Sequence, residues 1–184
     1  CIRYAAFLAE RGYVTASLDY RLASEAKFPA LIEDCKAAIR WMRANADEIG
    51  MDPDRLGVAG GSAGGYLAAM VGSTAGLFEG DGGNNDVSSE VRAAALWFPA
   101  TDLQPESPSS NLMMKVAGAR LFHTTKPSKE QLKISSPVTY AERMVPTITM
   151  TGDIDQHVPL GRVPECHAAL DKSGVRNELP DFQD

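Results

Sequence analysis

A cluster of glycines around one serine is the part of this sequence best suited to do chemistry. Residues 60–65 read Gly-Gly-Ser-Ala-Gly-Gly, between a short apolar stretch (56–59) and a segment with helical spacing (66–73). A phosphate-binding loop would need Lys followed by Ser or Thr after its last glycine, but Tyr66 and Leu67 stand there. A dinucleotide-binding loop would need glycines at its first, third and sixth positions, which this segment lacks. Neither nucleotide-binding interpretation fits.

The spacing Gly60-x-Ser62-x-Gly64 fits a nucleophile elbow, a strained strand-to-helix turn that exposes the serine hydroxyl. We expect a side chain at position 60 or 64 to collide with neighbouring backbone, so that only small residues fit there. The turn would also leave the amide of Ala63 at a helix N-terminus, where it can stabilise an oxyanion. The alternative is a plain glycine-rich turn with an idle serine, but the strand before it and the helix after it favour the elbow.

Further motifs extend over nearly the whole chain. They are Asp19-Tyr20-Arg21-Leu22, Phe28-Pro29 with Asp34, Asp52-Pro53-Asp54-Arg55-Leu56, Pro99-Ala100-Thr101-Asp102 and Ser135-Ser136-Pro137-Val138-Thr139-Tyr140. With the elbow, they resemble the α/β-hydrolase superfamily, in its esterase/lipase branch near the hormone-sensitive lipases and the bacterial feruloyl- and acetyl-esterase-like domains. The resemblance implies a serine esterase that works without a cofactor.

The catalytic acid of elbow hydrolases follows the serine in the chain and lies after a later strand. Residues 152–159 read Gly-Asp-Ile-Asp-Gln-His-Val-Pro and resemble the family's Gly-x-x-Asp-x-x-Val-Pro loop. That match implies Asp155 as the acid that orients a histidine. Asp153 is the competitor, more typical of a loop or capping residue. The family usually has His before this glycine, where Thr151 stands here.

The chain offers no good candidate for the catalytic base. His157 is too close to the acid along one short loop, His167 falls in a predicted helix with a surface or packing role, and His123 precedes the acid. The family's histidine lies about 30 residues beyond the acid, at or past Asp184, and the loop with the second oxyanion donor would precede Cys1. We therefore expect a fragment that keeps the nucleophile, the acid and one oxyanion amide.

Apolar runs alternate with amphipathic stretches along the chain, which indicates a mostly parallel sheet covered by helices on both faces. We expect a partial α/β-hydrolase domain over residues 1–184, lacking N-terminal strands and the C-terminal strand and helix, with an irregular, cap-like excursion over about 103–136. The expected strands are 13–20, 56–59, 91–98 and 145–151, and the expected helices are 1–12, 29–49, 66–73 and 160–172.

Composition excludes several other classes of protein. The 184 residues carry 18 basic and 24 acidic side chains, a formal charge of −6, without a run of Lys or Arg, which argues against nucleic-acid binding. No apolar stretch is long enough to span a bilayer. The three cysteines are too few for a disulfide framework, and His157, Cys166 and His167 lack the close spacing of a metal site.

The residues therefore favour a serine carboxylic-ester hydrolase that acts through an acyl-enzyme on Ser62. By resemblance, its substrates would be small or carbohydrate-linked esters. Two alternatives stay open. A prolyl-oligopeptidase-type serine peptidase shares a similar serine motif and acid loop, and a hydrolase-like domain without catalysis would describe the expected fragment.

Overall fold

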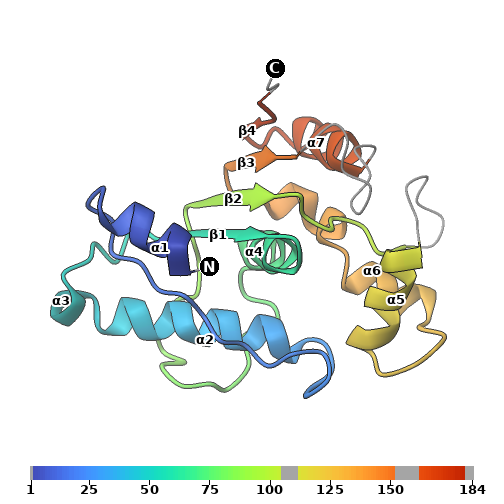
Figure 1. Ribbon diagram of the computed structural model, residues 1–184, viewed down its shortest axis with the longest axis horizontal. Helices are drawn as coiled ribbons and strands as arrows, with labels where there is room; N and C mark the ends of the chain where they lie inside the picture. Colours follow the sequence, from blue (N-terminus) through green and yellow to red (C-terminus); the bar gives the residue numbers. More distant parts are fainter. Residues whose placement is uncertain (1, 105–111, 152–161, 181–184) are drawn as a thin grey trace.

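The centre of the molecule is a four-stranded parallel sheet. The computed structural model describes residues 2–104, 112–151 and 162–180. Its strands are β1 (Gly57–Gly61), β2 (Ala93–Trp97), β3 (Thr147–Met150) and β4 (Asn177–Glu178), hydrogen-bonded in the order β1-β2-β3-β4 (Figure 1). Because every strand runs the same way, the carboxyl ends of all four meet at one edge of the sheet, where α/β proteins hold their ligands.

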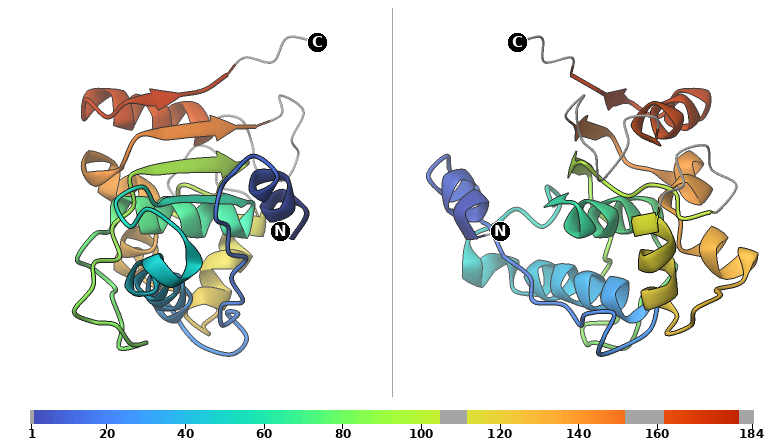
Figure 2. Two further views of the ribbon diagram at one scale, coloured as in Figure 1. Left: turned by 90° about the vertical axis from the view of Figure 1, so that its left-hand side faces the viewer. Right: turned by 45° about the vertical axis from the view of Figure 1, so that its right-hand side comes forward.

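Seven α-helices and one 3₁₀ segment are described around the sheet. They are α1 (Ile2–Ala9), α2 (Ala30–Ala44), α3 (Ala46–Ile49), α4 (Ala63–Ser73), α5 (Leu112–Leu121), α6 (Lys129–Ile134) and α7 (Arg162–Lys172), with a 3₁₀ segment η1 (Pro137–Arg143). α4 packs on β1 and β2 and is flanked by α2 and η1. Figure 2 (right) shows α1 on the other side of the strands from α4. The α/β architecture expected from the sequence is thus confirmed.

α4 lies at the junction of two hydrophobic clusters. Every residue from Gly65 to Ser73 is buried, which the mostly small and apolar sequence of the helix permits. One cluster joins α4 to α2, with Ile32 and Met70 at 0% exposure, and the other joins it to β2 and α7 through Leu96 and Leu170. Packing on both sides holds the helix, and with it the residue that precedes it, in one position.

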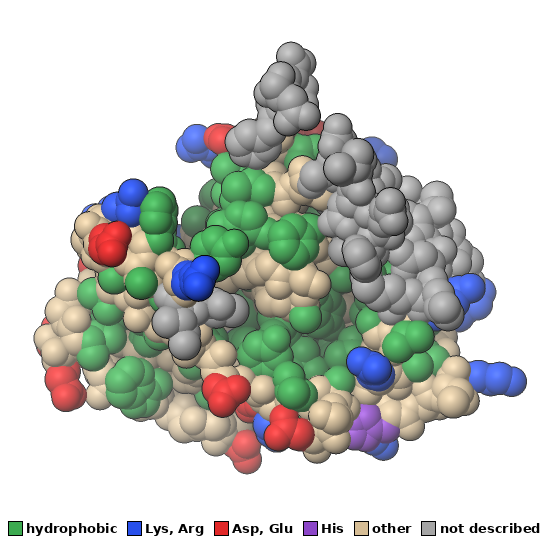
Figure 3. Space-filling model, viewed as in Figure 1, with side chains coloured by type: hydrophobic (Ala, Val, Ile, Leu, Met, Phe, Trp, Pro, Cys, Tyr) green, Lys and Arg blue, Asp and Glu red, His purple; other side chains and the backbone are tan. Residues whose placement is uncertain are grey.

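Residues 13–20, predicted as a strand, do not join the sheet. Tyr13 and Val14 are 64% and 43% exposed, and no strand is assigned in that range. β-branched and aromatic residues favour a strand only where a neighbouring strand supplies packing and hydrogen bonds. β1 is the edge strand of the described sheet, and its Gly57, Ala59 and Gly61 are exposed. Figure 3 shows hydrophobic side chains around a hollow on this face of the molecule.

The other helices differ less from those predicted from the sequence. The predicted helix 29–49 is interrupted at Asn45, whose φ of −107° and ψ of 21° leave the helical region, so α2 and α3 are separate. The helix after the serine begins at Ala63 instead of 66, because the small residues after Ser62 already wind. The stretch 103–136 contains α5 and α6, the latter begun by a capping box of Ser128 and Gln131. Among the described residues, no helix is long and apolar enough to cross a membrane.

Candidate active site

Ser62 lies at the tight turn between the end of β1 and the start of α4. Its φ of 53° and ψ of −117° place it in a region that residues other than glycine rarely occupy. Two hydrogen bonds hold it there: its amide donates to the carbonyl of Trp97 at 2.9 Å, and its carbonyl accepts from the amide of Tyr66 at 2.9 Å. A strained conformation at a strand-to-helix junction, braced from both sides, is the geometry that an exposed nucleophile requires.

The glycines around the serine play unequal roles. A Cβ on Gly60 would lie 2.3 Å from the carbonyl oxygen of Gly64, and one on Gly65 would lie 3.0 Å from the carbonyl oxygen of Trp97. A Cβ on Gly64 itself would meet nothing within 4 Å. The expectation of a clash was therefore right for position 60 and wrong for position 64. Gly64 supplies the backbone that Gly60 approaches, and its own Cβ direction is open; the second close approach is at Gly65.

Ala63 is the first residue of α4 and is exposed beside the serine. The first amides of a helix have no intrahelical acceptor and point outward from its positive end. No described residue accepts a hydrogen bond from the Ala63 amide. The Ser62 amide, in contrast, is already used by Trp97. Of the two amides, only that of Ala63 lacks an acceptor among the described residues, so it is the one that could bind a developing oxyanion.

The predicted acid Asp155 falls outside the described residues, as do its competitor Asp153 and His157. The structure does describe β3, which ends at Met150 immediately before that loop and lies two strands from β1. Neighbouring strands are about 4.8 Å apart, so the carboxyl ends of β1 and β3 are about 10 Å apart on the same edge. The loop after β3 therefore starts on the side of the sheet where Ser62 lies, and the role of Asp155 stays a prediction.

The two described histidines are engaged away from the serine. His123 Nε2 lies 2.5 Å from the carbonyl oxygen of Ala23, where it joins the excursion to the loop before α2. His167 is buried in α7, and its Nδ1 is hydrogen-bonded to Oδ1 of Asn177 in β4. The packing role expected for His167 is the one observed. Within the described part of the chain, no group of His, Cys, Asp or Glu could hold a metal ion.

The described cysteines are unsuited to act as nucleophiles. Burial raises the pKa of the Cys35 thiol to about 12, and it raises that of Cys166 to about 11. A thiol with such a pKa is almost entirely protonated near neutral pH, and the thiolate is the reactive form. Ser62 remains the candidate nucleophile among the described residues.

Sequence reasoning missed Phe98, which follows β2 directly beside the elbow. β1 and β2 pair with Gly61 opposite Trp97, so Ser62 and Phe98 are the next residues on the two strands. Phe98 has a φ of 38° and is 39% exposed. No local pattern in the sequence marks Phe98, because its place beside the serine depends on which strand pairs with β1 and in which register.

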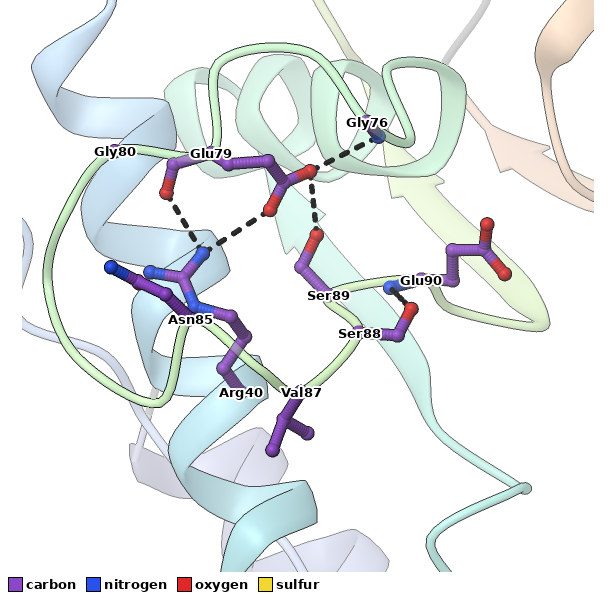
Figure 4. Close-up of a pocket in the computed structure, with 9 residues that line it drawn as sticks. All are labelled: Arg40, Gly76, Glu79, Gly80, Asn85, Val87, Ser88, Ser89 and Glu90. Atoms are coloured by element: carbon purple, nitrogen blue, oxygen red, sulfur yellow. Dashed lines mark hydrogen bonds and ion pairs between the residues drawn. The ribbon is translucent and has the colours of Figure 1, made fainter.

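A separate polar pocket lies at the other end of α4. Its lining includes Arg40, Glu79 and the backbone near Gly76 (Figure 4). The helix between them has 11 residues, so the pocket is about 16 Å from Ser62 along the helix axis. Glu79 accepts hydrogen bonds from Lys36 Nζ at 2.8 Å, Arg40 Nη1 at 3.2 Å and Ser89 Oγ at 2.9 Å. This cluster links α2 to the loop after α4 and lies away from the elbow.

Burial and hydrogen bonding shift the pKa values of Lys36 and Glu79 in this cluster. Desolvation lowers the pKa of Lys36, only partly opposed by its bond to Glu79. Burial acts to raise the pKa of Glu79, but the hydrogen bonds from Lys36 and Ser89 outweigh it, and the net pKa is below its ordinary value. Both pKa shifts follow from the burial of Lys36, whose wholly buried ammonium group needs Glu79 as a hydrogen-bond acceptor.

Comparison with known proteins agrees with this geometry. The profile of the BD-FAE family matches residues 2–170. The chain belongs to the BD-FAE family. Esterase LipQ of Mycobacterium tuberculosis is 30% identical over 179 residues, which cover 94% of this chain and 42% of LipQ.

Among solved structures, this BD-FAE chain is similar to a thermophilic esterase, Est2, of the Planctomycetes species Thermogutta terrifontis. The TM-score is 0.81 at 31% identity, covering 98% of this chain and 63% of that one. A truncated carbohydrate esterase from gut microbiota gives a TM-score of 0.81 at 29% identity, covering 89% of this chain and 63% of the other. The chain therefore spans about two fifths of LipQ and somewhat under two thirds of these solved structures.

These relatives confirm the resemblance to α/β-hydrolase esterases and the fold that it implied. The relatives named above are an esterase of Mycobacterium tuberculosis, a thermophilic esterase and a carbohydrate esterase.

Proposed function

We propose that the protein carrying this chain is a serine carboxylic-ester hydrolase in which Ser62 is the nucleophile. The observation that carries the proposal is the backbone of Ser62, held at a φ of 53° between a strand and a helix. Strain of this kind costs about 1–3 kcal/mol and persists where the surrounding structure enforces it, most often at functional sites. An idle serine in a loose turn would have no reason to be so held.

The reaction would proceed in two steps. Ser62 Oγ attacks the ester carbonyl while a histidine takes the hydroxyl proton, and the carbonyl oxygen becomes an oxyanion that accepts a hydrogen bond from the Ala63 amide. The alcohol leaves with that proton, and an acyl-enzyme remains. Water then attacks the acyl group, and the acid is released as Ser62 regains its proton. Asp155 would orient the histidine and stabilise its imidazolium.

Substrates would be small or carbohydrate-linked carboxylic esters. This part of the proposal draws on the relatives, among them a carbohydrate esterase and an acetyl ester-xyloside bifunctional hydrolase. Another structure of Thermogutta terrifontis esterase 2 is phosphoramylated by tabun. Tabun is an organophosphorus reagent, and such reagents phosphorylate activated nucleophilic hydroxyls, which supports serine chemistry in this fold. For the excursion over about 103–136, we keep the proposal of a cap beside the site.

Hydrolysis of a nitrophenyl ester by the full-length protein tests the nucleophile. Ser62→Ala should lower kcat by roughly 10⁴-fold or more, because the covalent step is lost. Ser17→Ala is the matched control, since Ser17 is exposed and lies far along the chain from the elbow. Both variants should unfold at the same urea concentration as the parent. Retained turnover in Ser62→Ala would refute the assignment.

A further inference from the structure

Phe98 presents an aromatic ring beside the residue that precedes the proposed nucleophile. Its ring lies over Gly61, the residue before the serine: a Cβ built on Gly61 would be 3.3 Å from Cζ of Phe98 and 3.5 Å from Cε2. The ring is also 39% exposed, although large aromatic side chains are usually well covered. Because Ser62 is the next residue after Gly61, this exposed ring is adjacent to the nucleophile.

The backbone holds Phe98 firmly in this place. Its amide donates to the carbonyl of Met150 at 2.7 Å, and the carbonyl of the preceding Trp97 accepts from the Ser62 amide at 2.9 Å. The peptide unit between Trp97 and Phe98 thereby bridges the strand of the elbow to the strand that precedes the predicted acid loop. Its φ of 38° is unfavourable for an aromatic residue, and this conformation turns the chain away from the strand direction.

Phe98 contributes little to the hydrophobic core of the described residues. It belongs to neither of the hydrophobic clusters formed by the described residues, whereas Phe28 and Phe78 pack against one of them. The neighbouring Trp97 does pack, stacked on Tyr4 of α1 with ring centroids 5.7 Å apart. Phe98 is strained and exposed, whereas the neighbouring Trp97 packs against α1. An aromatic residue with these properties is suited to contact a ligand.

We propose that Phe98 is a specificity-determining residue, whose ring forms one apolar wall beside Ser62 and packs against the apolar group next to the scissile ester carbonyl. This inference rests on the proposed function. It assigns to Phe98 no part in bond making or proton transfer. The ring selects among esters by contact and by size: a group that covers it gains apolar contact, and a group too large for the space is excluded.

The test compares two series of esters on the full-length protein. One keeps the nitrophenyl leaving group and lengthens the acyl chain from acetyl to butyryl and octanoyl; the other keeps acetyl and varies the alcohol. In Phe98→Ala, we expect the ratio of kcat/KM between the shortest and longest member of at least one series to change about tenfold or more. Phe98→Leu should change the same ratio less. Trp41→Ala is the matched control, because Trp41 is 52% exposed on α2 and should leave the ratios unchanged.

A second arm uses Gly61 to move the ring without removing it. Gly61→Ala would press its methyl group against Phe98, and the ring must give by a few tenths of an ångström. We expect Gly61→Ala to change the selectivity ratio in the parent protein, but not in the Phe98→Ala background, where the ring is gone. A merely structural role would give the same Gly61→Ala effect in both backgrounds.

The outcomes separate this inference from the function on which it rests. If hydrolysis depends on Ser62 but the ratios in Phe98→Ala match those of the parent in both series, the proposed role of Phe98 is refuted and the proposed esterase function is retained. A parallel fall in kcat/KM for every ester, with unchanged ratios, also overturns it. If the parent hydrolyses none of the esters, both proposals fall. Urea unfolding of Phe98→Ala and Phe98→Leu shows that the compared proteins are folded.

Discussion

Adding one methyl group at Gly60 should do far more damage than adding it at Gly64. The Cβ of an alanine at position 60 would lie 2.3 Å from the carbonyl oxygen of Gly64 and 2.4 Å from its carbonyl carbon. An ordinary contact between such atoms needs about 3.4 Å or more. Since both partners are backbone, no side chain can rotate away, and β1 and α4 must separate by about 1 Å.

The expected cost follows from that displacement. Overpacking a tight site typically costs about 1–3 kcal/mol, and the upper end applies where only backbone can move. A shift of about 1 Å at a reacting group costs about 10²-fold in rate. We therefore expect Gly60→Ala to destabilise the protein by about 3 kcal/mol and to lower kcat at least 10²-fold. In Gly64→Ala, the methyl group meets open space and replaces a glycine within a helix, which should stabilise by up to about 1 kcal/mol.

Urea unfolding followed by circular dichroism measures the stability of both variants, and nitrophenyl acetate hydrolysis measures the activity of Gly60→Ala. The opposite sign of the two stability changes is the distinguishing result. Equal midpoints for Gly60→Ala and Gly64→Ala would show that residues 60 and 64 are not in contact, and the elbow geometry would have to be abandoned.

The remaining predictions concern the buried ion pairs and the acid. Glu79→Gln should destabilise by about 2 kcal/mol, because Lys36 loses its charged acceptor; the figure is reduced from that of a fully buried pair since Glu79 is 35% exposed. Glu90→Gln, on the same loop but exposed, should leave the urea midpoint unchanged. The lowered pKa of Glu79 means that its contribution is present above the ordinary value of 4.5 and is lost as pH falls through the folded-state pKa, so the stabilities of parent and Glu79→Gln should converge in acid; a constant gap down to pH 2 would contradict this. Asp155→Asn should lower kcat about 10⁴-fold while Asp153→Asn retains activity, and the reverse ranking would identify Asp153 as the acid.

The sequence was most informative where chemistry imposes spacing. Two glycines at fixed distances from Ser62 predicted a strand-to-helix turn, because few other residues allow it, and the structure has that turn. It was less informative about which atoms make the glycines necessary. Gly64 satisfies the motif, yet the close approaches are at Gly60 and Gly65, since they depend on the packing of α4 against the ends of β1 and β2.

Long-range pairing explains the other differences. Residues 13–20 have the composition of a strand, but whether they form one depends on a partner strand that local pattern does not encode. Phe98 was passed over for the same reason: its closeness to Ser62 results from the register of β1 with β2, residues more than 30 apart in sequence. The predicted acid rests on motif position alone and lies outside the described residues.

The two hydrogen bonds at the ends of the strands have a mechanical consequence. Ser62 donates to the carbonyl of Trp97, and Phe98 donates to that of Met150. The last hydrogen bonds of the β1–β2 and β2–β3 strand pairs are therefore made by the residues proposed to contact the substrate. These amides should exchange with solvent as slowly as those of the sheet interior, because their opening breaks strand pairing. The serine can then stay strained through each turnover, since its conformation relaxes only when the sheet itself opens.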